Sequence, residues 1–166
     1  LKAYYTDKDY DKAFQIFIKL AEDENYSETA KFHLHRLYIN GRGTKKNVQK
    51  GIELLEELVE LNSALAQHEL AKIYYSGFDK FKQDYKKATH YFKLSANQGF
   101  VFSQNSLGII YHGGNGDEPI DYDLAFKWWK LASEQNHASS QSSLGTMYAR
   151  GLGTSKNEKE ATRLFK

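Results

Sequence analysis

The sequence repeats itself with a period of about 37 residues, and this period limits the fold more than any other feature does. A leucine and a tyrosine four residues apart recur four times, and the tyrosines are Tyr38, Tyr74, Tyr111 and Tyr148. A glycine follows each tyrosine by three residues, and a small residue precedes each leucine by four. A chain with such a period forms stacked copies of one small structural unit.

A second set of repeated positions follows each glycine. Small residues recur at Ala13, Gly51, Ala88, Ala125 and Ala161, and a bulky residue stands four positions after each of them. Asn or Asp stands four positions before each small residue, as Asp9, Asn47, Asp84, Asp121 and Asn157. Small and bulky residues four apart share one helix face, where the small one admits a neighbouring helix. The Asn or Asp is typical of a helix N-cap, and the glycine is typical of a left-handed C-cap.

Each unit is therefore predicted to be a helix, a glycine turn, an N-cap and a second helix. Strand-type alternation is absent, so we expect an all-α fold. One helix pair cannot bury its apolar face alone, which predicts a right-handed superhelical solenoid of helix-turn-helix repeats. The expected organisation is a single repeat domain and a fragment of a longer chain, with a partial unit over 1–24, repeats over about 27–61, 64–98 and 100–136, and a truncated repeat over 138–166.

Composition excludes several classes of function. The 23 basic and 21 acidic residues give a net charge of +2, which offers no global electrostatic case for nucleic-acid binding. The absence of cysteine excludes disulfides and thiolate metal sites. No apolar run approaches the roughly 18 residues that a membrane span needs, so no membrane insertion is expected in this segment. The cellular compartment stays open.

Two segments carry a resemblance to a known family. Leu107–Tyr111 (LGIIY) and Leu144–Tyr148 (LGTMY), with the AFKWW and ATRLF segments that follow them, resemble the tetratricopeptide pattern. The period here is longer, and the extra residues fall in joints such as GLGTSKN, which resemble the Sel-1-like repeat. The resemblance implies an α-solenoid that binds other proteins as an adaptor or scaffold.

Several short motifs suggest other chemistry but lack its context. The GLGTSKN segment looks like a phosphate loop, yet it follows a predicted helix and lacks the G-x-x-x-x-G-K-[ST] spacing. The alternating carboxylates of Asp7, Asp9 and Asp11 lack the later glycine and glutamate of a calcium loop. His33 and His35 point to different helix faces, which disfavours a shared metal. We predict no catalytic residue, metal or cofactor, and catalysis by dispersed residues is kept as an alternative.

The functional prediction is a monomeric module whose concave groove binds another protein or a peptide. The groove would be lined by the side of each first helix that faces away from the repeated leucines, where apolar and basic residues occur together. Basic members favour a partly acidic partner. The alternative for each apolar member is packing in the core, and the alternative function is an inhibitor or immunity-type protein that blocks an enzyme through loops or the convex face. The predicted contact residues are Phe32, Arg36, His68, Lys72, Tyr75, Phe102, Asn105, Ile109, His112 and Arg150.

Overall fold

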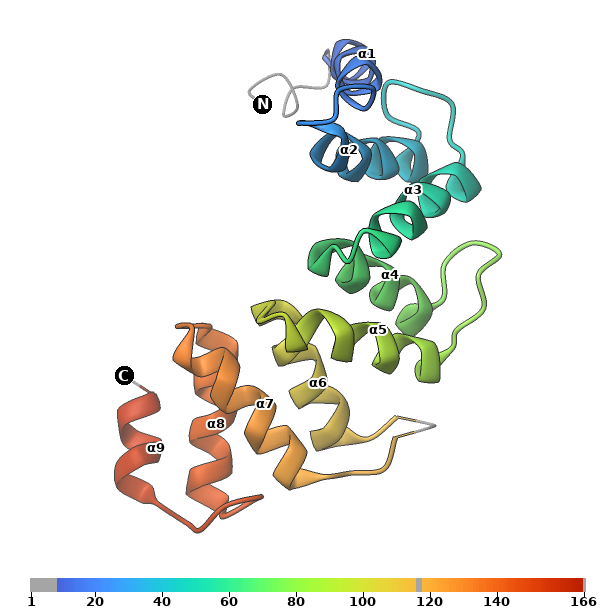
Figure 1. Cartoon of the computed structure of the whole chain (residues 1–166). Coiled ribbons are helices and arrows are strands. Elements are labelled where there is room, and N and C mark those ends of the chain that lie inside the picture. Colours follow the sequence, from blue (N-terminus) through green and yellow to red (C-terminus); the bar gives the residue numbers. More distant parts are fainter. Residues whose placement is uncertain (1–8, 116–117, 166) are drawn as a thin grey trace. The chain divides into compact units, whose positions relative to one another are not determined.

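The computed structural model describes residues 9–115 and 118–165 (Figure 1). Within these residues, all the elements of regular secondary structure are α-helices. Asp7, one of the three alternating carboxylates, lies outside the described residues. The prediction of an all-α chain is confirmed. The helices are α1 (Tyr10–Leu20), α2 (Ser27–Asn40), α3 (Val48–Glu60), α4 (Ala64–Ser76), α5 (Tyr85–Asn97), α6 (Val101–Gly113), α7 (Tyr122–Glu134), α8 (Ala138–Arg150) and α9 (Glu158–Leu164).

The chain divides into two compact units, residues 1–70 and residues 71–166, and α4 crosses the boundary between them. In the first unit, α2 packs against both α1 and α3. In the second unit, α6 packs against α5 and α7, and α8 packs against α7 and α9. Within each unit, a helix therefore packs on its neighbours in the chain, as helical hairpin repeats do (Figure 1). The handedness of the superhelix stays a prediction.

The predicted N-caps are present at four of the five positions. The side chains of Asn47, Asp84, Asp121 and Asn157 each accept a hydrogen bond from the backbone N–H three residues ahead. The prediction for Asp9 is wrong, because its carboxylate makes no cap hydrogen bond to α1. The backbone of Asp9 has ψ of 5°, whereas the four true caps have ψ between 88° and 96°. Its carboxylate lies 3.4 Å from Lys12 Nζ instead.

One backbone hydrogen bond recurs in every joint between the two helices of a repeat. The N–H of the cap residue donates to the carbonyl of the repeated tyrosine, over 2.8 Å for Asn47 to Tyr38. The other three joints have the same bond at 2.8, 2.8 and 2.9 Å. The chain can return in so few residues because the glycine after the tyrosine has positive φ, between 64° and 69° in the four joints. The repeated positions of the sequence therefore close a hairpin.

The second glycine of the G-x-G joints allows a close approach between backbones. A Cβ atom on Gly43 would lie 2.0 Å from the carbonyl oxygen of Tyr10, and one on Gly153 would lie 2.2 Å from that of Tyr122. Tyr10 and Tyr122 are the first residues of α1 and α7, so each of these joints rests on the start of the helix before its own hairpin. This backbone contact explains why glycine stands at these positions, and no bound phosphate is needed to explain it. The contact therefore supports the interpretation of GLGTSKN as a structural joint.

Packing between the helices depends on residues of complementary size. A Cβ atom on Gly108 of α6 would lie 2.3 Å from the buried indole of Trp129 in α7. One on Gly145 of α8 would lie 2.8 Å from the ring of Phe165. In the first unit the order is reversed, because the position of these glycines holds His35 and the small residue is Gly51. A Cβ atom on Gly51 would lie 2.8 Å from the His35 carbonyl oxygen. At each of these three contacts, a glycine leaves room for the facing helix.

Replacing Gly108 with alanine should destabilise the second unit by about 1–3 kcal/mol, because the new methyl group overlaps the Trp129 indole. The matched control is Gly113→Ala in the same helix, where a Cβ atom would meet no atom within 4 Å. This control should be neutral or stabilising by up to about 1 kcal/mol. Urea unfolding followed by circular dichroism measures both changes. Equal effects of the two substitutions would contradict the packing described here.

Candidate partner-binding surface

The predicted contact residues of the first unit differ in how much surface they offer. Arg36 is exposed on α2, and Phe32 is half-buried with its ring 4.7 Å from the ring of His35. His68 is only 8% exposed, so the accessible side chain expected there is not found. On α4, the preceding Ala66 and Gln67 are buried as well.

The second unit carries an exposed apolar stripe along α6. Phe102 and Ile109 lie two helical turns apart, and each is 53% exposed. Phe102 packs its ring on Phe100 and on His137, at centroid distances of 5.5 and 5.6 Å. Ser106 lies between them on the same side, and its hydroxyl group donates a hydrogen bond to the Phe102 carbonyl over 2.9 Å. Large apolar side chains with this exposure are available to a partner.

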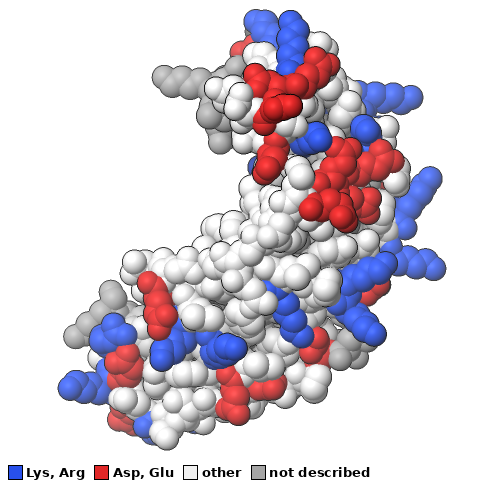
Figure 2. Space-filling model, viewed as in Figure 1, with Lys and Arg blue, Asp and Glu red and all other residues white. Residues whose placement is uncertain are grey.

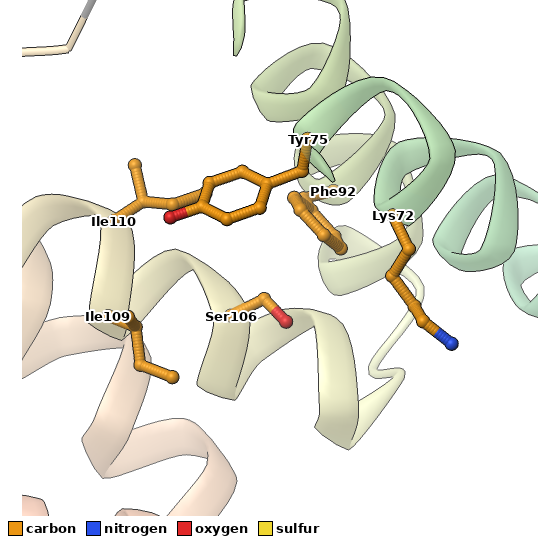
Figure 3. Close-up of a pocket in the computed structure, with 6 residues that line it drawn as sticks. All are labelled: Lys72, Tyr75, Phe92, Ser106, Ile109 and Ile110. Carbon is orange, nitrogen blue, oxygen red and sulfur yellow. The ribbon is translucent and has the colours of Figure 1, made fainter. Parts of the chain in front are cut away.

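A pocket of about 150 Å³ opens beside this stripe, between α4 and α6 (Figure 3). Phe92 of α5 contributes a buried ring, and Tyr75 of α4 packs edge-on against it with centroids 6.3 Å apart. Lys72 is exposed at one edge, with its ammonium group extending outward in Figure 3. The six lining residues are Lys72, Tyr75, Phe92, Ser106, Ile109 and Ile110.

Two further predicted contacts already take part in internal packing. The Asn105 side-chain oxygen accepts a hydrogen bond from the Ser140 hydroxyl over 2.9 Å, which ties α6 to α8. The His112 ring packs on Trp129 and Tyr122, at 5.2 and 5.6 Å between centroids. Arg150 is exposed at the end of α8. Lys72, Tyr75 and Ile109 are thus the predicted residues that the structure brings together in one place.

Polar side chains elsewhere do not form a reactive arrangement among the described residues. His137 Nδ1 lies 2.9 Å from the Ser140 hydroxyl, but Ser140 is 0% exposed and its hydroxyl serves helix packing. No group of three or more His, Asp or Glu side chains in residues 9–115 and 118–165 could hold a metal ion. Over the same residues, the helices are too short or too polar to cross a bilayer.

Charges are grouped differently on different helices. Carboxylates gather over α3 in Figure 2, where this helix carries Glu53, Glu56, Glu57 and Glu60. Glu57 lies 2.8 Å from Lys31 Nζ of α2, and Glu53 lies 3.5 Å from Lys50 Nζ. The pocket of the second unit differs from this helix, since its lining includes a lysine and no carboxylate.

Burial lowers the pKa of both histidines of α2. The His35 ring is 3% exposed, and loss of hydration lowers its pKa to about 4, although the Phe32 backbone and the Glu69 carboxylate act in the opposite direction. The pKa of His33 is also lowered, by burial and then by the Arg36 charge. The folded first unit therefore favours a neutral His35 ring over the whole range near neutral pH.

Sequence reasoning missed three lining residues of the pocket. Phe92 stands at one of the repeated bulky positions, a pattern that indicates helix packing, and its buried ring also lines the pocket. Ile110 is 1% exposed and is also among the lining residues. Ser106 occupies a position where other repeats have His33, Glu69 and Ser143. A short side chain at this position was the available signal that space is left between neighbouring first helices.

The architecture defines the class: an all-α solenoid built from helical hairpin repeats. The sequence profile of the Sel1 repeat matches residues 3–25, 32–63, 64–100, 101–137 and 138–166, which together are most of the chain. The chain belongs to the Sel1 repeat family. Members of this family are in general protein-interaction scaffolds and typically not enzymes. That the repeats here form a single domain stays a prediction.

Solved structures show the same fold. A Sel1 repeat protein from Oxalobacter formigenes superimposes with a TM-score of 0.83 at 25% identity, covering 94% of this chain and 44% of that one. A protective antigen of uropathogenic Escherichia coli strains, which displays an SLR fold, gives a TM-score of 0.79 at 22% identity, covering 92% of this chain and 36% of that one. The chain thus spans less than half the length of either protein. The search of curated proteins found no match.

Acid should weaken the first unit through His35. An unfolded histidine has a pKa near 6.5 and the folded one about 4, so protons bind the unfolded chain first as pH falls through this window. Stability is full above pH 6.5, and about 2 kcal/mol should be lost from this group by pH 5. Urea unfolding at pH 7 and pH 5 measures the loss, which should be smaller in His35→Gln. The exposed His90→Gln should behave as the parent protein, and an unchanged loss in His35→Gln would disprove the assignment.

Proposed function

We propose that this chain is a non-catalytic interaction module that binds a partner protein or peptide along the first-helix face of its repeats. The observation that carries this proposal is the exposed stripe of α6, where Phe102 and Ile109 are each 53% exposed beside a pocket. Apolar surface of this kind costs free energy in water, and covering it with a partner recovers that cost. The general role of Sel1 repeat proteins as scaffolds supports the same interpretation.

The proposed contact surface comprises exposed or half-exposed residues on the first helices. In the second unit these are Lys72, Tyr75, Phe102 and Ile109, with Arg150 at the end of α8. In the first unit, Arg36 and Phe32 have accessible surface. Asn105 and His112 act mainly by holding the helices beneath, and the buried His68 is left out. The module works as a monomer, takes protein rather than nucleic acid, and needs no cofactor.

Capture of a partner with cross-linking and mass spectrometry tests this proposal. The variant Lys72→Glu/Phe102→Ser/Ile109→Ser changes three exposed side chains, so the helices should fold while partner capture falls at least about tenfold. The matched control Lys86→Glu/Leu94→Ser/Ile120→Ser changes one exposed lysine and two exposed apolar residues elsewhere in the second unit. Helical circular dichroism should be the same in both variants. Unchanged capture by the first variant, or equal loss in the control, would refute the assignment of this face.

A second candidate function is an inhibitor or immunity-type protein that blocks an enzyme through its joints. The two central joints favour it, because each presents an exposed apolar side chain, Phe78 at 37% and Ile120 at 56%. Paired backbone hydrogen bonds also join Phe78 with Phe81 in one joint and Asn115 with Glu118 in the other.

Exchange of a joint separates the two functions. Residues 77–83 would be replaced by the Gly-Leu-Gly-Thr-Ser-Lys of the last joint, which ends on the same kind of cap. If the partner binds along the first-helix face, the exchanged chain should capture it as well as the parent chain within about twofold, because the exposed residues of α6 remain. Loss of capture in this chimera, together with normal capture by the variant of the α6 face, would instead establish binding through the joints.

A further inference from the structure

The pocket between α4 and α6 has the size of one bulky side chain. Its volume is about 150 Å³. Protein cavities of roughly 150 Å³ with aliphatic and aromatic walls hold a molecule as large as benzene. The opening toward solvent lies beside Ile109, which is 53% exposed, so a side chain can enter from a partner that lies along α6.

The walls require an apolar occupant. Phe92, Ile109 and Ile110 contribute only hydrocarbon surface, and Tyr75 lies across the pocket with its ring between α4 and α6 (Figure 3). The one short polar wall residue, Ser106, already donates its hydroxyl to the carbonyl of Phe102 over 2.9 Å. An aromatic or large aliphatic side chain thus fills the space without leaving this hydroxyl as an unsatisfied donor.

Lys72 places a positive charge at the edge of the pocket. Among the six described residues that line it, Lys72 is the charged one and none is a carboxylate. Lys72 is exposed, and its ammonium group points outward at the rim rather than into the pocket (Figure 3). A carboxylate that flanks the buried side chain of a partner would lie close to this ammonium, whereas a flanking lysine would be repelled.

We propose that this pocket is an anchor site for an acidic segment of a partner protein, in which one bulky apolar side chain is flanked by Asp or Glu. The apolar side chain enters between Tyr75, Phe92 and Ile109, and the flanking carboxylates face Lys72. This inference rests on the proposed function and adds to it the chemistry of the residue that is recognised.

Methyl NMR of the whole chain with labelled isoleucines tests the proposal. The probe is the peptide acetyl-Glu-Asp-Gly-Phe-Gly-Glu-Asp-amide, which should shift the methyl signals of Ile109 and Ile110 in a saturable manner. The buried Ile52 of the first unit serves as an internal control and should not respond. The same peptide with alanine in place of phenylalanine should give no saturable shift. A peptide with four lysines in place of the acidic residues should bind at least about threefold more weakly.

Charge reversal at the rim is the decisive variant. Lys72→Glu changes an exposed side chain and should make the lysine peptide bind more tightly than the acidic peptide. The substitution Lys86→Glu on α5 also changes an exposed lysine, but it should leave the acidic peptide as the tighter binder. Equal responses to the two phenylalanine peptides in the parent chain, or no saturable shift from either, would overturn the proposal. Shifts of Ile109 that depend on protein concentration without peptide would also overturn it, because a second copy would then occupy the pocket.

Failure here is distinguishable from failure of the proposed function. If the variant Lys72→Glu/Phe102→Ser/Ile109→Ser, here called the α6-face variant, loses its partner but the peptides leave the Ile109 and Ile110 methyl groups unchanged, only the anchor assignment is wrong. If the α6-face variant keeps its partner, the proposed function itself is wrong, whatever the peptides do.

Discussion

The hydrogen bond from each cap N–H to a tyrosine carbonyl holds this architecture together, because it closes every helical hairpin at the same place. It connects Asn47 with Tyr38 in the first unit and recurs three times in the second, always at 2.8 or 2.9 Å. With the joint closed, the two helices of a repeat are fixed side by side, and their apolar faces need only fit each other. The joint, rather than intrinsic helix propensity, sets the spacing of the repeated positions.

Much of the fold could be predicted because its causes are local and repeated. A cap residue such as Asn157 acts on its own first turn, and a glycine such as Gly151 acts on its own φ, so both leave a direct trace in the sequence. Asp9 shows the limit of this reasoning. It has the right residue type at the right position, but its backbone is not extended, and the side chain therefore makes no cap.

The candidate surface could be predicted only in part, because exposure depends on neighbouring helices that the pattern of one helix does not describe. Ile109 and His68 were both assigned to the outward side of a first helix, yet one is 53% exposed and the other 8%. The pocket has a similar origin. Its walls come from α4, α5 and α6, with the short Ser106 among them, and volume left between helices is a property of the helices together. No periodicity in a single repeat records it.

The close contacts of Gly43 with Tyr10 and of Gly153 with Tyr122 constrain the two outer joints. A joint whose backbone touches the carbonyl of an earlier helix cannot lengthen or gain a side chain at that glycine without separating the two elements. The two central joints are each one residue longer than the outer joints and carry sequences unrelated to theirs, and the joint that follows Tyr74 has no second glycine. New loop sequences can therefore arise in the middle of this chain while its outer joints stay unchanged, so one scaffold can diversify its surface without altering how its helices stack.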